Sequence, residues 1–329
     1  MKINTINYEL LKKPISLIYR KPGDRIFLSM AVFLGISIVL LTIVMAFVLY
    51  GESKEAITRF GVLGFPLKAV WDPAINLEFG ALTFIAGTLF TSIGALVLSF
   101  VPAVAIAIFT AEYAPRWLSV IVDNLVNLIA AVPSVVVGIW GIFVFTPWMR
   151  DCVYMPFFSW STDNFPALVP LLGNPIGFGM STATIILALM VLPYTAALTR
   201  DAIRLVPREQ REASWALGAT HREVILMAVL PYSRSGILAG VILSFGRAIG
   251  ETMAVAMLIG NKNTLPFTLF GPGATMPSVI INEFREAVGN IHYSSLMAVG
   301  LALFAISLIV NLLAAWISRK FAFAGGQMV

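Results

Sequence analysis

A basic island interrupts an otherwise apolar chain at residues 200–234, which read RDAIRLVPREQREASWALGATHREVILMAVLPYSR. Six of these 35 residues are arginine, and the stretches on both sides are strongly apolar. Such a compact basic loop between apolar runs is typical of a membrane protein that exposes the loop on one side of the bilayer. We therefore expect this island to be the surface through which the membrane-embedded part contacts another protein.

The island predicts two short helices joined by a tight turn. Pro207 suits the first turn of a helix, where its missing N–H is not needed, and Gly218 supplies a C-terminal stop. Thr220 and Glu223 have the spacing of a capping box, which opens the second helix, and we expect Pro231 to close it. The first helix offers a small apolar face that suits another protein's groove, formed by Ala213, Ala216 and Leu217.

This spacing resembles the cytoplasmic signature loop of binding-protein-dependent ABC importer permeases. That loop reads Glu-Ala-Ala, three residues, Gly, nine residues, Ile, one residue, Leu-Pro. The matching positions are Glu212, Ala213, Gly218, Leu230 and Pro231, while Ser214 replaces the second Ala and Ala228 replaces the Ile. The resemblance implies that Glu212, Ala213, Ser214, Gly218, Leu230 and Pro231 belong to the coupling helix region that receives the motion of an ATPase subunit. The alternative is a solvated basic loop that follows membrane topology rules.

The composition predicts a protein that lives in lipid. Of the 329 residues, 59% are hydrophobic and only 12% are charged, whereas about a quarter are charged in soluble domains. Apolar segments near the bilayer-spanning length of about 20 residues occur six times. They cover residues 26–50, 81–111, 118–148, 180–199, 236–260 and 294–318.

The Lys and Arg residues predict the orientation of these spans. A cytoplasmic N-terminus places fifteen of the 22 on the inner side and six in the outer loops, with Arg247 inside a span. Both termini and the 200–234 loop are therefore expected in the cytoplasm. This asymmetry also accounts for the net charge of +5, so the sequence gives no reason to invoke nucleic acid.

Three features of the spans and loops bear on a transport path. Pro102, Pro133 and Pro193 fall inside spans, where each removes a backbone hydrogen bond; such bends line a cavity or are ordinary kinks. Asp123 is expected at the cytoplasmic end of the third span, where it meets a basic partner, lines an inner gate or is simply hydrated. Residues 276–288 have helical periodicity and predict a short interfacial helix with Glu283, Arg285 and Glu286 on its polar side.

The fifth span carries the strongest functional signal, a charged pair inside the membrane. Arg247 and Glu251 are four residues apart, which predicts that they stack on one helix face together with Gly240 and Ser244. Each charge at mid-membrane costs on the order of 3 kcal/mol. Either the pair neutralises itself and locks helix packing, or Arg247 offers its planar donors to an oxyanion in transit while Glu251 positions it. Small residues at GxxxG spacing, 236/240 and 246/250, predict close approach of neighbouring helices.

A second resemblance separates these two interpretations. The segment GRAIGETMAV at 246–255 is similar to the fifth-span motif of phosphate ABC importer permeases, and more to the PstC type than to its partner PstA. The segment PSVVVGIWG at 133–141 resembles another part of that family. The resemblance implies that Arg247 and Glu251 take part in the translocation of inorganic phosphate.

The same resemblance implies the architecture and the partners. We expect an all-α integral membrane protein with six transmembrane helices of the type I ABC importer permease, or MetI-like, architecture. Residues 1–25 would be a cytoplasmic tail, 26–318 the permease domain with the coupling loop 200–234, and 319–329 a second cytoplasmic tail. The implied partners in the bacterial inner membrane are a second, PstA-like permease, two PstB-like ATPases and an extracytoplasmic PstS-like phosphate-binding protein.

The chain lacks motifs for chemistry of its own. A Gly-Lys dipeptide occurs nowhere in the sequence, so a Walker A phosphate loop is excluded and ATP-Mg is expected on the partner ATPase. The chain is thus expected to hold no cofactor and to be no enzyme. The alternatives are a permease for another oxyanion such as sulfate or molybdate, an ion-coupled secondary transporter or channel, and a membrane sensor or scaffold.

Overall fold

The computed structural model describes residues 22–263, 265 and 268–322, of which nearly all that form regular structure are helical. Within these residues, helices long and apolar enough to cross a membrane occur six times. They are Ile26–Glu52, Leu82–Tyr113, Ser134–Asn164, Met180–Arg204, His221–Ile249 and Gly289–Ile317. The expected number of spans is confirmed, but the third and fifth differ from the predicted positions. The structure divides into two units, residues 1–51 and 52–329.

The first unit contains one long helix, α1 (Pro22–Glu52). From residue 26 onward nearly every side chain in it is exposed, and its mean hydropathy of 2.9 is the highest of the spans. Its hydroxyl groups bond back to the helix itself, as Ser37 Oγ does to the Phe33 carbonyl at 2.8 Å. A helix that is apolar on all sides and satisfies its own polar groups suits a lipid environment.

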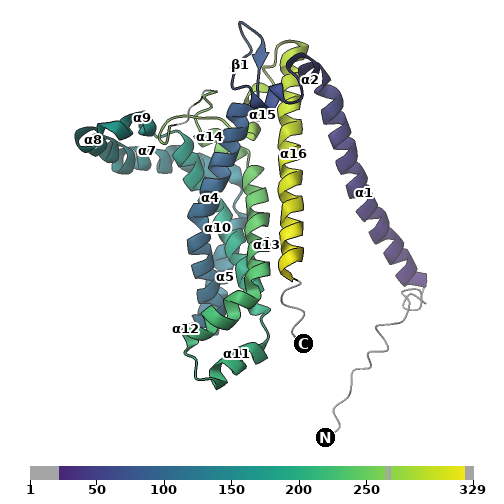
Figure 1. The fold of residues 1–329 in the computed structure, drawn as a ribbon, viewed down its shortest axis with the longest axis vertical. Helices are drawn as coiled ribbons and strands as arrows, with labels where there is room; N and C mark the ends of the chain where they lie inside the picture. The colour runs from purple at the N-terminus through teal and green to yellow at the C-terminus, as the bar shows by residue number, and fades with distance from the viewer. Residues whose placement is uncertain (1–21, 264, 266–267, 323–329) are drawn as a thin grey trace. The chain divides into compact units, whose positions relative to one another are not determined.

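The second unit is built around α10 (Met180–Arg204), the most buried of the spans. It packs against α4 (Leu82–Ile108) and α13 (Leu230–Ile249), and α13 packs in turn against α16 (Gly289–Ala322), as Figure 1 shows. A Cβ on Gly240 would lie 2.8 Å from Leu198 Cβ, and one on Gly236 would lie 2.6 Å from Ala202 Cβ. The predicted close approach at 236/240 is confirmed, because only glycine leaves room for α10 there.

The third predicted span is wrong because the helix breaks in its middle. Helix α5 (Arg116–Ala131) ends before Val132 and Pro133, whose backbones are extended, and α6 (Ser134–Trp140) begins a new direction. Proline disfavours helical backbone in the residue before it, so the break follows from Pro133. Helical structure then continues without interruption to Asn164. The helical turns are Gly141–Phe145, α7 (Thr146–Met149), Arg150–Tyr154 and α8 (Met155–Asn164), and α7 and α8 project sideways from the bundle (Figure 1).

The fifth span is shifted toward the N-terminus relative to the prediction. The short helix α12 (His221–Val224) continues through a wide π-helical turn, Ile225–Val229, directly into α13. Pro231 therefore does not close a helix; it lies inside the continuous helical run His221–Ile249, directly after the wide turn, where the altered hydrogen-bond pattern accommodates its missing N–H. The helix ends instead at Ile249, and α14 (Met253–Leu258) follows after a break.

Several short elements form a cap at the end of the bundle opposite α11 (Arg208–Ala216), as Figure 1 shows. They are α2 (Lys54–Phe60), α3 (Gly64–Leu67), the antiparallel pair β1 (Trp71–Asp72) and β2 (Glu78–Phe79), and α15 (Met276–Glu283). In the strand pair, Trp71 lies opposite Phe79. The helix expected at 276–288 exists, but it ends at Glu283 and its first turn is buried rather than interfacial. Glu283 accepts hydrogen bonds from Trp71 Nε1 at 2.7 Å and from Asn263 Nδ2 at 3.1 Å.

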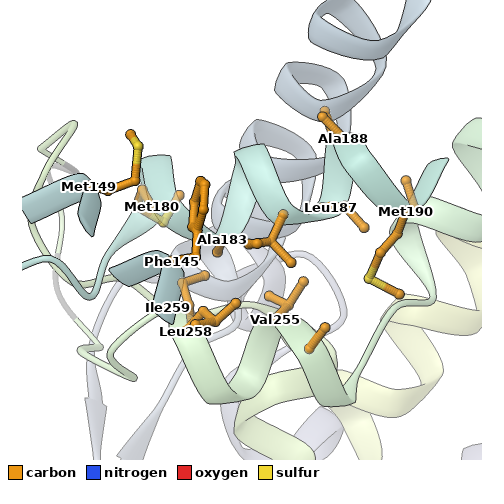
Figure 2. Close-up of a cluster of buried hydrophobic side chains, with 14 of the residues drawn as sticks. Phe145, Met149, Met180, Ala183, Leu187, Ala188, Met190, Val255, Leu258 and Ile259 are labelled. Carbon is orange, nitrogen blue, oxygen red and sulfur yellow. The ribbon is translucent and has the colours of Figure 1, made fainter. Parts of the chain in front are cut away.

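The largest apolar cluster joins α10 to the segments that follow the two breaks. Phe145 from the third span gathers beside Met180 with Leu258 and Ile259, which lie at the end of α14 (Figure 2). Glycine again permits the contact, since a Cβ on Gly138 of α6 would lie 2.6 Å from Met257 Sδ and 3.3 Å from Ala254 Cα of α14. The cluster also holds α9 (Val169–Leu172), which follows the turn Pro166–Leu168, through Leu172.

Candidate functional site

Arg247 and Glu251 lie on opposite sides of a helix break. Helix α13 ends at Ile249, and Gly250, Glu251 and Thr252 form a non-helical turn. In this turn the Glu251 N–H donates to the Ala248 carbonyl at 3.3 Å, and Thr252 Oγ1 donates to the Gly250 carbonyl at 3.1 Å. The predicted stacking at i,i+4 spacing is therefore wrong, because that spacing places side chains together only while the helix continues.

The four residues that were predicted to share one helix face do not share it. Gly240 faces α10 and Ser244 is buried, whereas Arg247 is exposed and Glu251 is half-buried. The second small-residue pair makes a helix contact at one of its two positions. A Cβ on Gly246 would lie 3.4 Å from Asn311 Oδ1 of α16, whereas one on Gly250 would meet carbonyl oxygens of its own turn at 3.8 Å. Within the residues that the structure describes, neither Arg247 nor Glu251 has an ion-pair partner within 4.0 Å. The two charges thus do not neutralise each other at contact distance.

The Arg247 guanidinium lies against an aromatic ring. Its Cζ is 4.1 Å from the centre of the Tyr194 ring, which belongs to α10. An aromatic face attracts a cation electrostatically at this distance. Beside the two side chains is a small hollow of about 70 Å³, lined by the end of α5, the start of α6, the middle of α10 and Arg247.

The hollow lies where the breaks meet. Ile129, Ala130 and Val132 at the end of α5 line it, and α6 and α14, which follow the two breaks, pack directly on each other. Pro193 of α10 lacks an N–H, so the carbonyl of Leu189, which also lines the hollow, has no α-helical donor. Irregular backbone at membrane depth is tolerated where it is buried in protein or lines a water-filled cavity.

This arrangement can bind an oxyanion. An exposed guanidinium on a membrane span costs on the order of 3 kcal/mol or more if lipid covers it, so protein or water must cover the face that carries Arg247. Guanidinium presents planar N–H donors that match the oxygens of phosphate and stays charged at every physiological pH.

The start of α11, the glycine turn and the capping box of the coupling loop have the local structure that the sequence predicts. Helix α11 begins after Pro207, and Gly218 has a φ of +82°, the left-handed conformation that favours glycine. The side chain of Thr220 accepts the Glu223 N–H, and the Glu223 carboxylate accepts the Thr220 N–H, so the capping box is formed. Leu217 is 90% exposed. Ala213 and Ala216 are exposed as well, so the apolar face expected for contact with another protein is uncovered. Helix α11 lies at the end of the bundle (Figure 1).

The remaining signature residues fall in two places. Glu212 and Ala213 are exposed on α11, and Ser214 donates its hydroxyl to the Gln210 carbonyl at 3.1 Å. Leu230 and Pro231 lie in the first turn of α13, on the far side of the π-helical turn. The structure thus keeps one part of the signature on the exposed helix and the other at the start of the fifth span.

A buried ion pair attaches α11 to the bundle. Arg211 Nη2 lies 2.8 Å from Glu112 Oε1, with side chains that are 15% and 8% exposed, and it also donates to the Ile203 carbonyl at 3.0 Å. A further Arg211 donor bonds the Val206 carbonyl. His221 Nε2 lies 3.2 Å from the Glu112 carbonyl oxygen. Sequence reasoning missed Glu112, although a carboxylate directly after the second apolar run was a detectable signal.

Asp123 forms a second ionic contact within the chain. It lies 2.6 Å from Arg200 and 3.1 Å from Arg204, both on α10, and Arg204 also donates to Ser119 Oγ at 2.8 Å. The basic partner expected for Asp123 therefore comes from the same chain. These contacts join α5 to α10 at the end of the bundle that carries the coupling loop.

The sequence is similar to a known protein family and to several known proteins. The family model described as "Binding-protein-dependent transport system inner membrane component" matches residues 103–323. The chain is 38% identical over 308 residues to the phosphate transport system permease protein PstC of Pasteurella multocida, covering 93% of this chain and 91% of that protein. It is 39% identical over 273 residues to PstC of Mesorhizobium japonicum, covering 83% of each.

A solved structure of similar fold agrees with these relatives. A chain of the inward-facing MetNI methionine ABC transporter superposes with a TM-score of 0.53 at 17% identity, covering 77% of this chain and 99% of that one. At this identity the similarity concerns the fold. It confirms the MetI-like permease architecture expected from the sequence.

Proposed function

The chain belongs to the binding-protein-dependent transport system inner membrane component family, and on that premise we propose that it is the PstC-type permease subunit of an ABC importer for inorganic phosphate. The observation that carries this proposal is the exposed Arg247 guanidinium at the helix break of a membrane span. The relatives are named phosphate transport permeases, and guanidinium is the side chain best suited to phosphate.

Arg247 contacts the anion during passage, and Glu251 limits how tightly the anion is held. A path lined by an unopposed guanidinium would trap phosphate, whereas conduction requires binding weak enough to release it. A half-buried carboxylate beyond the turn adds repulsion at longer range. Glu251 thus acts on the anion's residence time rather than as a contact partner of Arg247.

The exposed face around Arg247 is covered by a second, PstA-like permease subunit. Because lipid cannot cover this charge cheaply, the phosphate path runs between the two subunits, with Arg247 on one wall. The 236/240 glycine contact is already used by α10 within this chain, so it stays outside that interface.

The coupling loop docks on a PstB-like ATPase. Leu217 and the exposed side of α11 enter a groove of that subunit, and the Arg211–Glu112 pair carries its displacement into the bundle. ATP-Mg is bound and hydrolysed by two such subunits, and this chain contributes no catalytic residue. Alternating access follows when the two permeases reorient around the hollow. We infer that both termini and the loop lie in the cytoplasm with the ATPases, and that a PstS-like binding protein delivers phosphate at the opposite side.

The test is phosphate uptake by vesicles that contain the assembled complex and enclose ATP, with phosphate-loaded binding protein on the other side. We expect uptake that requires ATP, that excess sulfate does not reduce, and that falls strongly in Arg247→Gln. Uptake without ATP indicates a secondary transporter or channel. Competition by sulfate indicates a different oxyanion, and normal uptake by Arg247→Gln removes the proposed role of that residue.

A further inference from the structure

Tyr194 makes two contacts, one with the Arg247 guanidinium and one with the end of α5. Its ring lies 4.1 Å from Arg247 Cζ, and its hydroxyl donates to the Ala130 carbonyl at 3.0 Å. The residue is half-buried on α10, directly after Pro193. One side chain therefore joins α10 to the end of α5 and to the last turn of α13.

The hydroxyl contact follows from the break in the third span. In a continuous helix the Ala130 carbonyl would accept the N–H of residue 134, but α5 ends at Ala131 and leaves its last carbonyls without helical donors. Such groups must be satisfied when water is scarce. Tyr194 supplies the donor, and the bond fixes the plane and position of its ring.

The ring contact leaves Arg247 able to bind an anion. Attraction between a cation and an aromatic face acts on the charge and needs no hydrogen-bond acceptor. In the described part of the chain, the structure records no hydrogen bond or ion pair from this guanidinium. Its donors thus stay available to oxygen ligands at the hollow, whereas a carboxylate in the place of Tyr194 would occupy them and cancel the charge.

We propose that Tyr194 is a positioning residue for phosphate translocation, whose ring holds the Arg247 guanidinium at the hollow and whose hydroxyl ties that position to α5. The inference rests on the proposed function of Arg247. Since Asp123 also joins α5 to α10, through Arg200 and Arg204, a displacement of this end of the two helices carries the ring and the guanidinium with it. The anion contact is thereby linked mechanically to the end of the bundle that carries the coupling loop.

Two substitutions distinguish the ring contact with Arg247 from the hydroxyl contact with Ala130. Each variant is tested in the complete complex in vesicles. Tyr194→Phe keeps the ring and removes the bond to Ala130, and Tyr194→Leu removes both. The measured quantity is phosphate taken up per ATP hydrolysed, with phosphate-loaded binding protein in excess. We expect this ratio to fall about threefold for Tyr194→Phe and about tenfold for Tyr194→Leu, with assembly unchanged.

A matched control and a double variant complete the test. Tyr293→Phe removes a hydroxyl from another half-buried tyrosine, on α16, and should leave the ratio unchanged. In an Arg247→Gln background, Tyr194→Leu should add less than about a twofold further loss, because a residue that acts through Arg247 has nothing left to position.

The outcomes distinguish this inference from the function it rests on. A normal ratio in Arg247→Gln contradicts the proposed role of Arg247, and the inference falls with it. A reduced ratio in Arg247→Gln with normal ratios in both Tyr194 variants overturns the inference alone. Equal losses of uptake and ATP hydrolysis in the Tyr194 variants indicate a packing role and also overturn it. If Tyr194→Leu fails to assemble, Tyr194→Phe decides, because it removes a single oxygen.

Discussion

The buried pair between Arg211 and Glu112 gives the most quantitative prediction about the coupling loop. Helix α11 is exposed along its length, so its attachment to the bundle depends on few contacts. Arg211 reaches from α11 to Glu112 in the last turn of the second span, at 2.8 Å. Glu112→Gln removes the negative charge from this pair while it preserves the shape of the side chain.

The free-energy cost of Glu112→Gln follows from the burial of the ion pair. Removing one partner of a buried ion pair costs about 3–5 kcal/mol, because the other charge is left uncompensated. Arg211 keeps its bonds to the Ile203 and Val206 carbonyls, so we expect the lower end, about 3 kcal/mol. At 1.36 kcal/mol per factor of ten, local opening of α11 should become more frequent by about two orders of magnitude.

Hydrogen exchange of the α11 amides in the solubilised permease measures this opening. Glu209→Gln is the matched control, since Glu209 is an exposed carboxylate on the same helix. We expect faster exchange in α11 for Glu112→Gln and unchanged exchange for Glu209→Gln. Equal protection of α11 in the two variants would refute the argument that the buried pair attaches the helix.

Three further predictions concern backbone, packing and charge. Gly218→Val should abolish co-purification of the ATPase, because a β-branched residue resists a φ of +82°, whereas Gly218→Asn should retain it; equal co-purification would contradict this. Gly240→Leu should lower the free energy of unfolding of the solubilised permease by about 1–3 kcal/mol, because the new side chain clashes with α10. Gly35→Ala on α1, where a Cβ meets no neighbour, should leave it unchanged. Asp123→Asn should lower the free energy of unfolding of the permease by about 1–3 kcal/mol, and the exposed control Asp163→Asn should melt as the parent does. Parental stability for both variants would show that the ion pairs of Asp123 with Arg200 and Arg204 do not hold α5 to α10.

Local chemistry made the coupling loop predictable from sequence. The left-handed glycine at 218 and the capping box between Thr220 and Glu223 depend on residues a few positions apart, and both are confirmed. Pro231 failed as a helix end because the π-helical turn before it changes the hydrogen-bond register, and no local rule signals such a turn.

The candidate site was only partly predictable. The sequence identified Arg247 and Glu251 as unusual, but their relation depends on where α13 ends, and a hydropathy window does not detect a three-residue turn. The third span was misplaced for the same reason, since the apolar run continues across the break at Pro133. Tyr194 gave no signal of its own, because its role depends on two helices distant in sequence.

The central claim is that Arg247 lines the route of the anion at the boundary between two permease subunits. A density map of the assembled complex with phosphate present tests it most directly. We predict that the guanidinium faces a solvent-filled gap between the subunits, against the Tyr194 ring, with anion density within hydrogen-bonding distance. A map in which Arg247 is packed away from that gap, with the anion elsewhere, would contradict the account.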